Sequence, residues 1–188
     1  MKKIILIHGS DSSPKKRRYQ ILFQEFNKLG VELSIPALPG GEHPHGKEWL
    51  EIIDREVKNS ENPIVLVGHS LGARAVLLYL DKFEKKVDTM ILISSPNNDF
   101  EKNRKERGGN FADFFDYAVD IEKIKKLANK FIVAHSKDDD SIPYAHGVEI
   151  AKQLGAEFLS YENMGHFSKD ERAEENAREF LKIIKLAL

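Results

Sequence analysis

One stretch near the middle of the chain constrains its fold more than any other. The apolar run 64–67 ends in Gly-His-Ser-Leu-Gly at positions 68–72, and a segment rich in helix-forming residues follows at once. A short apolar run that leads through such a turn into a helix is typical of a layered α/β fold. The turn would be so tight that the backbone at Ser70 is strained, and Gly68 and Gly72 lack the Cβ atoms that would collide there.

Strand-like and helix-like segments alternate along the whole chain. Apolar runs that predict strands lie at 3–8, 31–35, 64–69, 87–94, 131–135 and 157–161. Apolar residues at helical spacing predict helices within 13–29, 49–57, 71–80, 121–128, 143–154 and 172–186. This alternation predicts an α/β protein, a three-layer α/β/α sandwich around a mainly parallel sheet of about six strands.

Length and composition favour one globular domain. The chain has 188 residues, of which 41% are hydrophobic and 31% charged, so a single core is expected over residues 1–188. The irregular segment 97–120 is a candidate for a small cap. A net charge of -1, from 29 basic and 30 acidic residues, gives no reason to expect a nucleic-acid or membrane partner.

The chain contains no cysteine, which excludes a disulfide framework, a thiol nucleophile and a cysteine-based zinc site. Lys2 and Lys3 precede a short apolar run that reaches only to His8, whereas the hydrophobic part of a signal peptide needs about 7–15 residues. No run approaches the roughly 18 apolar residues of a membrane span. We therefore expect a cytoplasmic protein, and the sequence predicts neither a metal nor another cofactor.

The polar residues that could carry chemistry follow the ends of the predicted strands. Residues 8–10 follow the first strand, Ser70 the third, residues 138–140 the fifth and His166 the sixth. Ligands of such sheets bind beyond the carboxyl ends of the strands. We therefore expect these residues to meet in one site.

The order of these residues indicates nucleophilic catalysis. A serine hydroxyl needs a base to take its proton, histidine is the usual base, and a buried carboxylate orients that histidine. Ser70, the acidic loop and His166 occur in the order serine, acid, histidine, and Gly-x-Ser-x-Gly between a strand and a helix is the nucleophile-elbow pattern. The backbone N–H groups of Ser10 and Leu71 are the candidate donors to a developing oxyanion.

With these motifs the chain resembles the α/β-hydrolase superfamily, and within it the small serine hydrolases of the retinoblastoma-binding-protein type. The resemblance covers essentially the whole length and is most specific at 68–72, 121–143 and 165–167. It implies the minimal α/β-hydrolase fold with strand order 2-1-3-4-5-6. It also implies Ser70 as the nucleophile, His166 as the base and one of the loop aspartates as the orienting acid.

Two aspartates compete for the role of the acid. The acid of this family usually lies four residues before a proline, and Asp139 has that spacing from Pro143. Counting from the end of the strand instead supports Asp138. The loop also departs from the family pattern at His135, where glycine is common, and in its third aspartate, Asp140.

The expected function is therefore a serine hydrolase that cleaves carboxylic esters of small to medium acyl groups through Ser70, His166 and Asp139. Amides and thioesters use the same machinery and stay open. The alternative is a protein- or ligand-binding module on a hydrolase scaffold, with little catalysis. The expected partner is a small-molecule ester, and a protein partner stays open. An aromatic cluster within 111–117 either lines the acyl pocket or packs in the core.

Overall fold

The computed structural model describes residues 2–98, 100 and 111–188. Within them, one sheet has the strand order β2-β1-β3-β4-β5-β6, and every neighbouring pair is parallel. The strands are β1 (Lys3–Ile7), β2 (Glu32–Ser34), β3 (Ile64–His69), β4 (Val87–Ile93), β5 (Ala128–Ser136) and β6 (Glu157–Tyr161). The order reverses between β1 and β3, so the crevice for a ligand is expected at their carboxyl ends.

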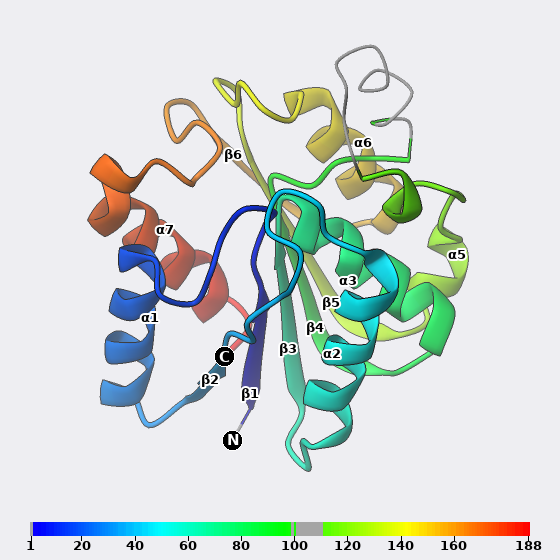
Figure 1. The fold of residues 1–188 in the computed structure, drawn as a ribbon, viewed down its shortest axis with the longest axis horizontal. Helices are drawn as coiled ribbons and strands as arrows, with labels where there is room; N and C mark the ends of the chain where they lie inside the picture. Colours follow the sequence, from blue (N-terminus) through cyan, green and yellow to red (C-terminus); the bar gives the residue numbers. More distant parts are fainter. Residues whose placement is uncertain (1, 99, 101–110) are drawn as a thin grey trace.

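Helices cover both faces of the sheet (Figure 1), which confirms the predicted three-layer α/β/α sandwich. Helices α1 and α7 pack on one face, and α2, α3, α5 and α6 pack on the other. The helices are α1 (Arg17–Lys28), α2 (Gly46–Lys58), α3 (Leu71–Phe83), α5 (Ile121–Ile124), α6 (Tyr144–Leu154) and α7 (Ala173–Lys185). Short 3₁₀ turns lie at Ala112–Phe114 and Asp170–Arg172.

Strand β1 shows how the sheet divides the core. Its five residues are all buried, because helices cover both faces of a parallel sheet. Ile5 and Ile7 pack into the core beneath α2 and α3, whereas Ile4 and Leu6 pack into the core beneath α1 and α7. The continuous apolar run near the N-terminus therefore supplies both cores through the alternation of side chains along a strand.

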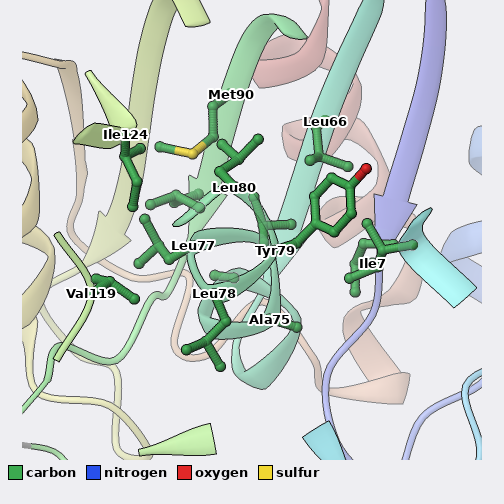
Figure 2. Packing of buried hydrophobic residues seen from close by; sticks show 14 of the residues in the cluster. Ile7, Leu66, Ala75, Leu77, Leu78, Tyr79, Leu80, Met90, Val119 and Ile124 are labelled. Atoms are coloured by element: carbon green, nitrogen blue, oxygen red, sulfur yellow. The ribbon is translucent and has the colours of Figure 1, made fainter. Parts of the chain in front are cut away.

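Helix α3 is the most enclosed helix of the layer that it shares with α2 and α6. Its residues from Leu71 to Asp81 are all buried, because most of them are apolar and the helix packs against neighbours on several sides. Figure 2 shows Leu66 and Met90 of the sheet on one side of this helix and Val119 and Ile124 of later segments on another. Since α3 begins at the residue after Ser70, this packing fixes the position of the serine.

The structure corrects one predicted boundary. The segment 121–128 was expected to be a short helix, but α5 ends at Ile124 and Ala128 already belongs to β5. Strand β5 starts this early because Ala128 pairs with Val87, the first residue of β4. No helix of the described residues has the length and apolar character that a membrane span requires.

Candidate active site

Ser70 occupies the sharp turn between β3 and α3. Its backbone has φ 57° and ψ -126°, a conformation that residues with a side chain rarely adopt. The Ser70 N–H donates to the carbonyl oxygen of Ile93 (2.9 Å) on the neighbouring strand β4. A Cβ on Gly68 would lie 2.4 Å from Ala73 Cα, and a Cβ on Gly72 would lie 2.2 Å from the carbonyl oxygen of Ile7. The two glycines therefore allow helix α3 to approach the strands closely behind the serine.

The variant Gly72→Ala is expected to lower the free energy of unfolding by about 3 kcal/mol or more, because the new methyl group meets backbone that cannot move aside. Urea unfolding followed by circular dichroism measures the change. Gly46→Ala is the matched control, since a Cβ there meets Asp113 at an ordinary 3.5 Å and should change stability by no more than about 0.5 kcal/mol. Equal stability of the two variants would contradict the close approach of α3 to β1.

The structure brings Ser70, His166 and Asp139 together from three different loops. His166 Nε2 lies 2.8 Å from Ser70 Oγ, and His166 Nδ1 lies 3.0 and 2.9 Å from the two carboxylate oxygens of Asp139. Because Nδ1 faces a carboxylate, it holds the proton of the neutral ring. Nε2 is then free to accept the proton of the serine hydroxyl.

The loop after β5 holds Asp139 in place. Its side chain is fully buried, and the backbone N–H groups of Ser141 and Ile142 both donate to Oδ1 at 2.9 Å. Burial alone would raise the pKa of Asp139, but hydrogen bonding from His135, His166 and the Ile142 amide outweighs burial and holds the pKa well below its usual value. Asp139 is therefore ionised at neutral pH.

Asp138 has a different neighbourhood. Its Oδ1 accepts hydrogen bonds from Ser136 Oγ and from the Gly165 N–H (2.8 Å), and Ser136 Oγ in turn accepts one from the Met164 N–H (2.9 Å). Burial alone would raise the pKa of Asp138, but the bonds from Ser136 and Gly165 outweigh it and lower the pKa. Asp138 thus joins the loop after β5 to the loop that carries His166.

Two flanking residues anchor the His166 loop. The backbone of Phe167 has φ 55°, and its fully buried ring packs edge-on against Tyr161 and Phe180. Burying this ring offsets the strain of the backbone. On the other side, His69 Nε2 lies 2.8 Å from the carbonyl oxygen of His166. Burial first, then the charges of His166 and Arg18, hold the pKa of His69 well below 6.5, so His69 is a neutral donor at this contact.

The loop after β1 lies directly against the serine. A Cβ on Gly9 would lie only 3.0 Å from Ser70 Cβ, and His8 Nδ1 lies 2.8 Å from the carbonyl oxygen of Gly9. Ser10 follows and borders the same cavity as Ser70. On the other side of Ser70, the Leu71 N–H is one of the first amides of α3, which have no acceptor within the helix and sit at its positive end. The Ser10 and Leu71 amides are the donors that the sequence suggests for an oxyanion.

The family model described as "Serine hydrolase" matches residues 4–178 of this chain. The chain belongs to this serine hydrolase family. It is 27% identical over 172 residues to YdeN of Bacillus subtilis, a protein named as a hydrolase, and the match covers 90% of this chain and 88% of YdeN.

Solved structures share the fold of this chain. The YdeN structure has a TM-score of 0.82 and 24% identity, over 98% of this chain and 100% of that one. Est1E from Butyrivibrio proteoclasticus, solved with ferulic acid bound, has a TM-score of 0.72 and 17% identity, over 98% of this chain and 90% of that one. The hydrolase therefore shares the α/β-hydrolase fold of the superfamily that its sequence resembles.

A cavity of about 670 Å³ opens over the serine of this hydrolase. It extends across the carboxyl edge of the sheet, from the start of α1 to the start of α6. Its α1 side is polar and its α6 side more apolar. The polar side includes Ser12, Lys16, Arg18 and Ser168, and the other side includes Phe100, Ile142, Pro143 and His146. The predicted residues Ser10, Ser70, Asp139 and His166 all border this cavity. Phe100 and His146 were not predicted to do so, because they belong to no motif.

None of the residues of the aromatic cluster at 111–117 that the structure describes lines the cavity, and its members range from buried Phe114 to exposed Tyr117. Phe111 and Phe114 are buried in the core beside α2 and α3, and Phe114 packs edge-on against Trp49. Buried Arg74, one turn after Ser70, holds this segment by donating to the carbonyl oxygens of Phe114 and Tyr117, each at 2.7 Å. An arginine inside an otherwise apolar helix was the signal that sequence reasoning missed. Part of the candidate cap, residues 99 and 101–110, lies outside the described residues.

Proposed function

We propose that this serine hydrolase cleaves carboxylic esters through an acyl-enzyme on Ser70. The observation that carries the proposal is the hydrogen-bonded series from Ser70 Oγ through His166 to Asp139. Such a series supplies the nucleophile, the base and the ion that orients the base. A histidine whose Nε2 accepts the hydrogen bond of a serine hydroxyl has no evident use in a protein that only binds ligands.

In the first half of the reaction, Ser70 Oγ attacks the ester carbonyl while His166 Nε2 takes the hydroxyl proton. The resulting oxyanion accepts hydrogen bonds from the Ser10 and Leu71 N–H groups. When the carbonyl reforms, the bond to the alcohol oxygen breaks and His166 returns the proton to that oxygen. Water then attacks the acyl-enzyme with His166 again as the base, which releases the acid and restores Ser70.

The cavity supports esters of small to medium acyl groups. About 670 Å³ is within the usual range of small-molecule sites, and the apolar side chains of Phe100, Ile142 and Pro143 offer contact to an acyl chain or ring. Est1E, which shares the fold, was solved with ferulic acid, a carboxylic acid of the kind that ester cleavage releases. Both observations favour a carboxylic ester as the substrate class.

A panel of nitrophenyl esters from acetyl to octanoyl, with a matched nitroanilide and a matched thioester, tests the proposal. We expect turnover of the esters with a maximum among the shorter acyl chains, slower turnover of the anilide, and covalent labelling by a fluorophosphonate probe. The contrary result is neither turnover nor labelling. A ligand or protein that binds wild type and Ser70→Ala equally would then favour the binding-module alternative.

A further inference from the structure

Asp139 is approached by two imidazole rings, and the proposed mechanism uses only one of them. His135 lies on β5, four residues before Asp139, and its side chain is fully buried. Its Nε2 lies 3.3 Å from Asp139 Oδ2 and 3.0 Å from the carbonyl oxygen of Ile142. His166 contacts the same Oδ2 at 2.9 Å.

The surroundings of His135 settle which of its nitrogens carries the proton. Nε2 faces two acceptors, the Asp139 carboxylate and the Ile142 carbonyl, so it must be the donor. Nδ1 is buried and has no hydrogen-bond partner among the described residues, which is consistent with an unprotonated nitrogen. The N–H of Nε2 therefore lies between the Ile142 carbonyl, at 3.0 Å, and the Asp139 carboxylate, at 3.3 Å.

Helix α6 has a glycine, Gly147, at the point where it contacts this ring. A Cβ on Gly147 would lie 2.4 Å from His135 Nδ1 and 2.8 Å from His135 Cβ. Glycine is a weaker helix former than alanine, and here its lack of a side chain makes room for the imidazole. Tyr144, one turn earlier on the same helix, packs edge-on against the ring at 5.9 Å. The position of the ring is thus defined by packing as well as by hydrogen bonding.

The two carboxylate oxygens of Asp139 are held differently. The Ser141 and Ile142 amides hold Oδ1, which also lies 3.0 Å from His166 Nδ1, so Oδ1 can act as a pivot about which Oδ2 turns. Among the described contacts, Oδ2 meets His166 and His135 alone. His166 must move and change its charge during turnover, so it cannot by itself hold the oxygen that orients it. His135 supplies a contact to Oδ2 that stays the same through the cycle.

We infer that His135 is a positioning residue, which fixes Oδ2 of Asp139 and the Ile142 carbonyl so that the carboxylate keeps facing His166 Nδ1. This inference rests on the proposed function, since it assigns His135 a part in the same reaction.

Three variants at position 135 test the inference on the best ester of the panel. His135→Leu keeps a buried apolar group of similar size but removes the donor, and kcat should fall about 10- to 100-fold, the range for loss of a hydrogen bond to a charged group. KM should change little, because His135 does not line the cavity. His135→Gln can return an N–H near the place of Nε2 and should recover much of the loss, whereas His135→Asn, which is too short, should not.

A double-mutant cycle separates positioning from a general effect on the fold. If His135 acts through Asp139, His135→Leu should lower kcat little further in an Asp139→Asn background, because the group that it positions is already lost. Gly147→Ala, which displaces the ring without replacing it, should lower kcat in the wild-type background as His135→Leu does. Urea unfolding shows that each variant is folded under the assay conditions.

The inference is overturned if His135→Leu keeps wild-type kcat, if glutamine is no better than leucine, or if the losses multiply in the double mutant. If the proposed function itself is wrong, the wild type neither turns over esters nor reacts with the fluorophosphonate.

Discussion

Ser70→Ala is expected to lower kcat on nitrophenyl esters by about 10⁶-fold, the size of loss seen when a serine nucleophile is removed from a hydrogen-bonded triad. The reason is chemical rather than structural, since alanine fits the turn as serine does and removes only Oγ. The free energy of unfolding should therefore stay the same or rise slightly, as expected where a site is strained for function. Steady-state kinetics and urea unfolding measure the two effects on one preparation.

A matched control for Ser70→Ala is Ser95→Ala. Ser95 is a buried serine that lies beyond the carboxyl end of β4 and donates its hydroxyl to the Pro96 carbonyl. It does not border the cavity, so kcat should stay within a few-fold of wild type. The assignment of the nucleophile would be wrong if Ser70→Ala kept fluorophosphonate labelling at the wild-type rate.

Asp139→Asn is expected to lower kcat by about 10⁴-fold, because an asparagine amide can donate to His166 Nδ1 and so stabilise the wrong tautomer of the ring. Asp138→Asn should lower kcat only about 10-fold. Its side-chain oxygen can still accept from the Gly165 N–H, so the loop that carries His166 stays tethered. Kinetics of the two single variants on the same ester give the comparison, and the reverse order would assign the orienting acid to Asp138.

Asp139→Asn should also change how the stability of the protein depends on pH. The pKa of Asp139 is lower in the folded protein than in the unfolded chain, so its ionised form stabilises the fold above the unfolded pKa of about 3.9. That contribution is lost as the pH falls toward the folded pKa. Asp139→Asn should therefore be less stable than wild type at pH 7, and the difference should shrink on acidification. Urea midpoints at pH 7 and at pH 3, which lies below the unfolded pKa, test the sign.

Local sequence patterns predicted the mainly parallel sheet and the placement of Ser70 and His166 at one edge of it. A strand that ends in Gly-x-Ser-x-Gly and leads into a helix leaves Ser70 few conformations, and the parallel order of the strands puts His166 at the same edge of the sheet. The choice between Asp138 and Asp139 was different. Neighbouring residues in a loop point in different directions, and the direction depends on which backbone amides the carboxylate finds.

Other features depended on contacts that spacing does not show. Aromatic side chains at helical intervals serve a core or a pocket equally well, and only the position of Phe114 against Trp49 shows that the segment packs in the core. Phe100 borders the cavity because the chain after β4 returns toward α6, where its ring meets His146. The role of His135 likewise depends on Gly147, twelve residues later and on another element.

The hydrogen bond between the Gly165 N–H and Asp138 affects which substitutions the site can tolerate. Asp139 and His166 sit on loops that are bonded to each other, so the β5–β6 edge carries both as one unit, while β3 and α3 carry Ser70 as another. The contact of His69 Nε2 with the His166 carbonyl joins the two units. Ser70 and His166 meet across the seam between these units, where β4 pairs with β5. Substitutions in that seam, far from any reacting atom, would alter the gap between serine and histidine. Packing within the sheet therefore sets the distance between Ser70 and His166.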